Sequence, residues 1–178
     1  MKSIKKIFRS EAFRIVITLA LIFIAVQGSW ILMKAALGTD VPLAYVPARS
    51  MEPALRVGDL VVIKGMNPDD ISVGHITVFY VPGHYGEDSY RIVHRVVNII
   101  SEEGTLGFET KGDNNPSSDF YRWGYIPESH IVGMVKYRVP YVGYLAIKLR
   151  EPLGIFFIIL LILIFIATEL YGSGKKKR

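Results

Sequence analysis

One serine of the chain lies in a setting that could make it a nucleophile. Ser50 lies between Pro47 and Pro53 and just before the apolar run at 60–63, so its hydroxyl is expected on a stiff turn beside a strand. Such a hydroxyl attacks a carbonyl group only if a neighbouring base removes its proton. Since most serines in turns are simply turn formers, Ser50 becomes a candidate nucleophile only if the chain also supplies a base and an acid.

A histidine further along the chain has the properties of that base. The residues around it alternate in the manner of a strand, which places Ile92, His94 and Val96 on one face. Histidine in general has an unperturbed pKa of about 6.5 and can therefore exchange a proton at neutral pH. For a histidine taken alone, a core residue bonded to a backbone carbonyl is the alternative. Because the Ser50 turn precedes it and a Gly-Asp-Asn-Asn segment follows it, we interpret His94 as the general base.

Two aspartates could orient the imidazole ring through its other nitrogen. Asp113 lies in a Gly-Asp-Asn turn, where an aspartate often bonds its own backbone instead. Asp119 follows a Pro-Ser-Ser segment and has no such evident local use. A buried acceptor at this place would hold the ring tautomer and stabilise the imidazolium that forms during attack. From the residues alone, both aspartates remain candidates.

Five blocks of residues in this order resemble a known family. The blocks are Arg49-Ser50-Met51-Glu52-Pro53-Ala54, Gly58-Asp59, Ile92-Val93-His94-Arg95-Val96, Lys111-Gly112-Asp113-Asn114-Asn115 and Val139-Pro140-Tyr141-Val142-Gly143. Together they resemble a type I signal peptidase over residues 43–147. The resemblance is to the archaeal and endoplasmic-reticulum branch, which has histidine where the bacterial branch has a catalytic lysine.

The resemblance implies a role for each candidate residue. Ser50 would be the nucleophile, His94 the base, Asp119 the third member of a Ser-His-Asp triad and Asp113 a support for the site. The implied substrate is the signal peptide of an exported protein, cut after a small residue, and neither a metal nor an organic cofactor is needed. His75, His84 and His130 show no metal-binding spacing and are expected to be solvated or core histidines.

The nucleophile block departs from its relatives at two positions. They commonly have Ser-Gly-Ser-Met, whereas this chain has Ala48 and Arg49 before Ser50 and Met51. The bacterial branch uses the first serine hydroxyl as a donor to the oxyanion, and Ala48 cannot supply it. The backbone N–H of Ser50 is the donor that remains, and a second must come from another amide, a side chain or water. Arg49 in place of glycine requires an ordinary backbone conformation there, or strain.

Composition and charge indicate a membrane protein with a more polar middle. Of the 178 residues, 51% are hydrophobic, and this excess is concentrated near the two ends. The net charge is +5, but the basic residues flank the apolar runs, which is typical of cytoplasmic flanks rather than of a nucleic-acid surface. The chain has no cysteine, which excludes disulfides, a thiol nucleophile and cysteine-ligated zinc.

These patterns predict an all-β extracytoplasmic catalytic domain flanked by N- and C-terminal transmembrane helices. The expected segments are a basic cytoplasmic N-terminus at 1–14, a transmembrane helix at 15–34, a β-rich peptidase domain at 38–150, a transmembrane helix at 152–170 and a basic cytoplasmic tail at 171–178. Strands are expected at 60–64, 75–81, 90–99, 106–110 and 130–139. The first apolar run is expected to be retained, although a cleavable signal peptide would also begin in this way.

The expected partners follow from this organisation. They are the signal peptides of preproteins, the lipid bilayer and the protein-export machinery, in a cell membrane or, in a eukaryote, the endoplasmic-reticulum membrane. The apolar stretch 141–147 either lies against the membrane surface or packs under the β domain. Two other functions fit the same pattern: a protease of the same fold that acts on other surface proteins, and a non-catalytic membrane adaptor that binds apolar peptides.

Overall fold

The computed structural model describes residues 11–102 and 104–175 of the chain. Residues 1–10 and 176–178, which hold much of the predicted basic flanks, lie outside the described residues. The chain divides into two compact units: the central segment Lys34–Arg150, and the two terminal segments that precede and follow it. All of the candidate site residues belong to the central unit.

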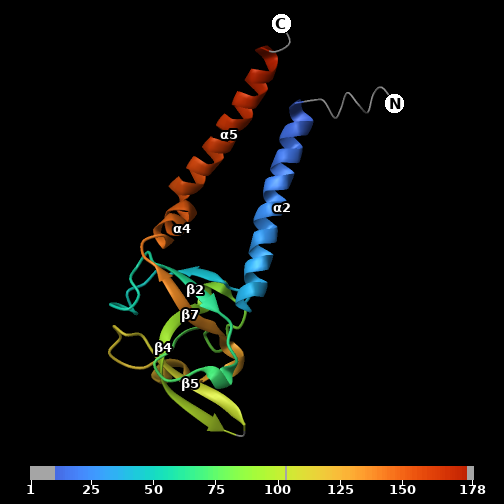
Figure 1. Ribbon diagram of the computed structural model, residues 1–178. Helices are drawn as coiled ribbons and strands as arrows, with labels where there is room; N and C mark the ends of the chain where they lie inside the picture. Colours follow the sequence, from blue (N-terminus) through green and yellow to red (C-terminus); the bar gives the residue numbers. More distant parts are fainter. Residues whose placement is uncertain (1–10, 103, 176–178) are drawn as a thin grey trace. The chain divides into compact units, whose positions relative to one another are not determined.

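The central unit is built on one seven-stranded sheet whose neighbouring strands are all antiparallel (Figure 1). In spatial order the strands are β1 (Leu43–Tyr45), β2 (Leu60–Lys64), β7 (Ile131–Val139), β3 (Ile76–Tyr80), β4 (Arg91–Glu102), β5 (Thr105–Lys111) and β6 (Ile126–Pro127). The five predicted strands are all present, and β7, the last in sequence, lies between β2 and β3. The β-rich middle of the chain is therefore confirmed.

Two clusters of buried apolar side chains hold this sheet together. The first lies around β2 and the loop before it, and consists of Val41, Val46, Met51, Leu55, Val61, Ile63 and Val78. The second lies around β4 and β5, and consists of Ile71, Phe79, Val96, Phe108 and Ile126. The serine block thus packs with the first cluster, whereas the strand that carries the histidine packs with the second.

Short helices complete the central unit, and the sequence did not predict them. They are α3 (Phe120–Trp123), α4 (Gly143–Arg150) and the 3-10 turns η1 (Pro68–Asp70), η2 (Asp88–Tyr90) and η3 (Glu128–His130). Helix α4 contacts β1, and Gly143, its first residue, is buried. Leu145 remains exposed on the same helix, so the stretch 141–147 packs on the domain at only one side.

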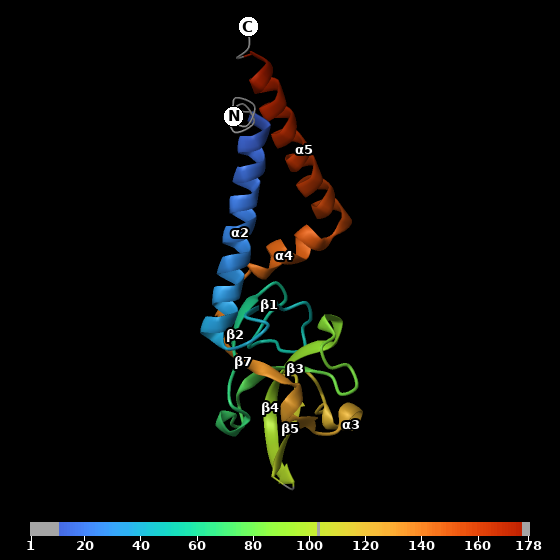
Figure 2. The ribbon, with the colours of Figure 1, turned by 90° about the vertical axis from the view of Figure 1, so that its right-hand side faces the viewer.

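Apolar helices lie at both ends of the chain. They are α2 (Glu11–Leu37) and α5 (Pro152–Lys175), which are labelled in both views of the molecule (Figures 1 and 2). Among the described residues, α2 alone is long and apolar enough to cross a membrane, over Ile15–Leu37. A second span is counted only if α4 and Pro152–Thr168 are taken together as one bent helix. This candidate span begins at the residue predicted for the first transmembrane helix, 15–34, and ends three residues later.

Candidate active site

Three side chains from distant parts of the sequence form one hydrogen-bonded line in the central unit. Ser50 Oγ lies 3.1 Å from Nε2 of His94, and Nδ1 of His94 lies 2.6 Å from Oδ2 of Asp119. The residues are 44 and 25 positions apart in the sequence. A hydroxyl, an imidazole and a carboxylate in this order can transfer the serine proton to the ring while the acid holds the other ring nitrogen.

The histidine and the aspartate are removed from solvent, whereas the serine is only half-buried. His94 and Asp119 are each 4% exposed. The ring of Phe79 meets the imidazole edge-on, with centroids 6.4 Å apart. Water therefore competes little for the hydrogen bond between His94 and Asp119, whereas Ser50 is only partly buried.

The aspartate is held by the strand and the helix on either side of it. Thr110 Oγ1, on β5, donates to Asp119 Oδ2 at 2.6 Å, and the backbone N–H of Asp119 donates to the carbonyl of Thr110 at 2.8 Å. Arg122 and Trp123 donate their N–H groups to the Asp119 carbonyl where α3 begins. Asp119 Oδ2 thus accepts from both Thr110 and His94, which fixes the carboxylate in line with the ring.

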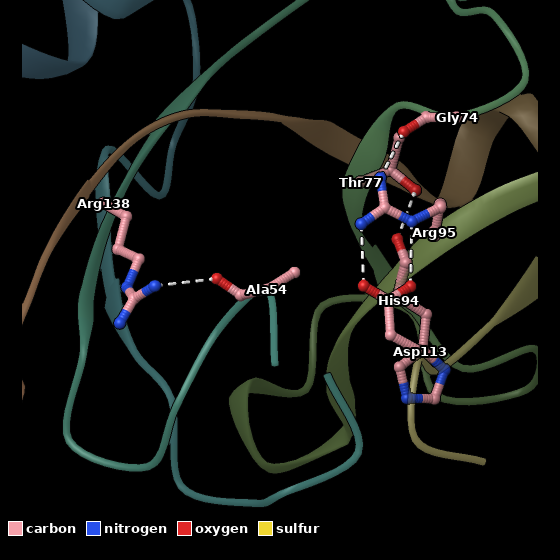
Figure 3. Close-up of polar contacts among 7 residues, drawn as sticks. All are labelled: Ala54, Gly74, Thr77, His94, Arg95, Asp113 and Arg138. Carbon is pink, nitrogen blue, oxygen red and sulfur yellow. Dashed lines mark hydrogen bonds and ion pairs between the residues drawn. The ribbon is translucent and has the colours of Figure 1, made fainter. Parts of the chain in front are cut away.

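Asp113 lies at a different place and has a different partner. Both of its carboxylate oxygens accept from Arg95, Oδ1 from Nε at 2.8 Å and Oδ2 from Nη2 at 2.7 Å (Figure 3). The third nitrogen of Arg95, Nη1, donates to the carbonyl of Gly74 at 2.7 Å. The hydrogen bond with Asp113 raises the pKa of Arg95, so this guanidinium stays charged.

The turn that contains Asp113 also holds the backbone of the serine block. The N–H of Asn114 donates to the carbonyl of Ser50 at 2.8 Å, and its side-chain Nδ2 donates to the carbonyl of Arg49 at 3.3 Å. Gly112 lies against the same carbonyl, since a Cβ atom there would be 2.7 Å from Ser50 O. This explains in packing terms why a glycine and an asparagine occur together in the Gly-Asp-Asn-Asn segment.

The loop between β1 and β2 presents Ser50 because its ends and its apolar side chains are fixed. Two backbone hydrogen bonds of 2.9 Å close the base of the loop: the N–H of Val46 donates to the carbonyl of Asp59, and the N–H of Gly58 donates to the carbonyl of Val46. Met51 and Leu55 are buried in the first apolar cluster, and Leu55 N–H donates to the Met51 carbonyl. Ser50 is therefore directly followed by Met51, whose side chain is fixed in the hydrophobic core.

The departure at Ala48 and Arg49 is accommodated without backbone strain. Within the described residues Tyr141 is the only non-glycine with a positive φ, so Arg49 has an ordinary backbone conformation. The Ser50 N–H donates to no acceptor within the part of the chain that the structure describes, which leaves it available to an oxyanion.

The other histidines do not converge on the line of three side chains. His84 contacts Glu87 at 3.2 Å and stacks on Tyr90, and His130 lies 3.3 Å from the hydroxyl of Ser129. Among the described residues no group of three or more His, Cys, Asp or Glu side chains is placed to hold a metal ion.

Sequence reasoning missed three contacts of the site: the hydroxyl of Thr110, the guanidinium of Arg95 and the amide of Asn114. A signal existed for Thr110, since it shares a strand face with Phe108 and a lone hydroxyl on a buried apolar face needs a partner. The pairing of Arg95 with Asp113 depends on strand register, and the sequence contains no comparable signal for it.

Comparison with known proteins shows close relatives along most of the chain, although no family model matches it. The chain is 31% identical over 153 residues to the signal peptidase complex catalytic subunit SEC11C of Homo sapiens, covering 83% of this chain and 78% of that protein. It is 34% identical over 170 residues to the signal peptidase complex catalytic subunit SEC11 of Schizophyllum commune, with coverages of 82% and 86%. For the corresponding subunit of Sclerotinia sclerotiorum the identity is 35% over 141 residues, with coverages of 76% and 80%.

Proposed function

This chain belongs to the family of signal peptidase catalytic subunits, and we propose that it is a membrane-anchored serine endopeptidase that removes signal peptides from exported preproteins. The single observation that carries the mechanism is the continuous hydrogen-bonded line from Ser50 through His94 to Asp119. The relatives are named catalytic subunits of a signal peptidase complex, which supports proteolysis as the reaction.

In the proposed reaction, Ser50 Oγ attacks the carbonyl carbon of the scissile peptide bond while His94 Nε2 takes its proton. The carbonyl oxygen becomes an oxyanion, to which the Ser50 N–H donates. His94 then gives the proton to the leaving amine, and the acyl group stays on Ser50 as an ester. Water attacks this ester with His94 again as the base, which releases the signal peptide and restores the serine hydroxyl.

The two aspartates take different parts in this proposal. Asp119 orients His94 and stabilises the imidazolium, because both groups are buried and 2.6 Å apart. Asp113 supports the site indirectly: through Arg95 it holds the turn whose Asn114 bonds the backbone of Ser50. It is therefore a positioning residue rather than a member of the triad.

Cleavage of a precursor by the detergent-solubilised full chain tests the proposed function. The parent is expected to release a signal peptide, with the cut after a small residue as determined by mass spectrometry, and Ser50→Ala is expected to lose this activity. Ser129→Ala is the matched control, because that exposed hydroxyl also lies near a histidine, His130. Equal processing by the parent and by Ser50→Ala would favour the non-catalytic peptide-binding adaptor instead.

A panel of precursors separates signal peptide removal from a same-fold protease with other surface substrates. Cleavage restricted to proteins without a signal peptide would contradict the proposed function. The names of the relatives place them in a complex, so partner subunits are also proposed for this chain.

For topology, we propose that α2 and α5 both cross the membrane, of the endoplasmic reticulum or of the cell, and that the sheet domain lies on the extracytoplasmic side. The uncharged run within Pro152–Thr168 supports the second span. Since the chain has no cysteine, single cysteines can be labelled cleanly with an impermeant maleimide. Ser72→Cys is expected to react from outside and Ser173→Cys only after permeabilisation; outside labelling at 173 would remove α5 as a span.

A further inference from the structure

A buried carboxylate lies outside the line of three side chains. Asp59, just before β2, is 0% exposed, and its Oδ2 accepts from the N–H of Arg56 at 2.7 Å and from Nε of Arg138 at 2.5 Å. Its Oδ1 is buried without a hydrogen-bond partner among the described residues. Arg138 is exposed, with 31% of its side chain accessible, so only the carboxylate end of this ion pair is buried. A buried carboxylate with one unsatisfied oxygen costs free energy, and an ion pair with a solvent-exposed partner contributes little to stability. A role in positioning the loop is therefore the better explanation for this pair.

The partner of this carboxylate connects the serine loop to the sheet. Arg138 lies on β7, opposite Val61 of β2, and its Nη1 donates to the carbonyl of Ala54 at 3.0 Å (Figure 3). One guanidinium thus contacts the loop at Ala54 directly and at Arg56 through Asp59. Because the guanidinium is planar and its nitrogens have fixed directions, these contacts also fix the orientation of the loop.

Two sets of hydrogen bonds hold the loop, one at Ser50 and the residue before it and one at a residue that follows Ser50 in the sequence. Upstream, Asn114 holds the carbonyls of Arg49 and Ser50. Downstream, Ala54 is only four residues from Ser50 and is held by Arg138. A displacement of the loop at either side would lengthen the 3.1 Å contact between Ser50 Oγ and His94 Nε2.

We propose that Arg138, together with Asp59, is a positioning pair that holds Ser50 within reach of His94. This inference rests on the proposed function, because it assumes that Ser50 is the nucleophile. The pair does not touch the reacting atoms, and it acts through the backbone of the loop that carries Ser50. A shift of about 1 Å in a reacting group can cost about 100-fold in rate, so loss of the pair should lower kcat.

The experiment compares Arg138→Gln with Lys136→Gln in the detergent-solubilised full chain. Both changes remove one positive charge from an exposed position of β7, but Lys136 makes none of the contacts to the loop. We expect Arg138→Gln to lower kcat by about 10- to 100-fold with KM within about twofold of the parent value. The pH at which activity is half-maximal should stay unchanged, because the base itself is intact. Lys136→Gln should keep the parent kcat.

A second variant separates positioning from loss of folding. Arg138→Gln leaves Asp59 as a lone buried charge, whereas the double variant Asp59→Asn/Arg138→Gln has no buried charge at this place. We expect the double variant to unfold at a temperature close to that of the parent and still to show the lowered kcat. Arg138→Lys keeps the charge but not the planar fork, and is expected to restore only part of the rate.

Three results would overturn the inference and leave the proposed function intact. They are a kcat equal to that of the parent in the double variant, a raised KM with unchanged kcat in Arg138→Gln, and a loss of kcat in Lys136→Gln as large as that in Arg138→Gln. The proposed function fails on a different result, namely cleavage by Ser50→Ala at the parent rate.

Discussion

Replacing Asp119 by asparagine should separate the two aspartates of the site. The substitution keeps the size of the side chain and removes its charge, and it acts on a carboxylate that is 2.6 Å from the imidazole and 4% exposed. During attack the ring becomes positively charged, and this charge loses its counter-ion in the variant. An asparagine amide can also turn its nitrogen toward His94 Nδ1 and impose the wrong tautomer, with the Thr110 hydroxyl then accepting instead of donating.

The magnitude follows from the burial of the pair. Two unit charges about 4 Å apart, at an effective dielectric constant of about 20, attract each other by about 4 kcal/mol. Removal of this attraction from the transition state lowers the rate by about 1,000-fold. Asp119→Asn should therefore reduce kcat by about three orders of magnitude and leave KM nearly unchanged, since the carboxylate is expected to bind no part of the substrate.

The assay is precursor cleavage by the detergent-solubilised full chain, with kcat and KM measured separately and thermal unfolding recorded for each variant. Asp113→Asn is the matched control. Its carboxylate pairs with Arg95, whose side chain is 33% exposed, so a loss of less than about tenfold in kcat is expected. The reasoning is refuted if Asp119→Asn keeps more than about a tenth of the parent kcat, or if Asp113→Asn is the more damaging of the two.

Three further substitutions test the surroundings of the site. Thr110→Val removes the hydroxyl that donates to Asp119 and should lower kcat by about tenfold, because hydrogen bonds to charged groups contribute about 1.5–3 kcal/mol; an unchanged kcat would contradict this. Gly112→Ala places a methyl group 2.7 Å from the Ser50 carbonyl oxygen and should lower kcat by about 100-fold in the cleavage assay. Parent activity in this variant would show that the turn can move to accommodate the methyl group. Phe108→Ala empties a fully buried position and should lower the free energy of unfolding by about 3–5 kcal/mol in denaturant titration; a loss below 1 kcal/mol would contradict the assigned core.

Local sequence patterns predicted the longer strands and missed the short elements. Alternation and turn residues located β4 and β7, because each is long enough for a period of two to be visible. Strand β1 has only three residues and helix α4 only eight, so neither contains enough periods to be recognised. Helix α4 forms where tertiary contact with β1 supports it, and such support cannot be read from a local pattern.

For the candidate site, the residue types could be predicted from their context, whereas the choice of Asp119 over Asp113 came only from the family resemblance. Ser50 and His94 were candidates from their context, and both aspartates followed in the right order. Which aspartate meets the ring depends on register: Arg95 lies opposite Lys111 in the sheet, which brings the following turn and Asp113 to the guanidinium. One residue of slip would change this partner, and the sequence does not state the register.

The central place of the last strand has a consequence for biosynthesis. Strand β7 joins β2 to β3, and without residues 131–139 no strand-to-strand hydrogen bonds connect the part of the sheet beside the serine loop to the part with the histidine. A nascent chain that ends at β6 therefore contains Ser50, His94 and Asp119 but lacks the strand that joins the two parts of the sheet. Assembly of the complete sheet is therefore expected only after residues 131–139 have been synthesised.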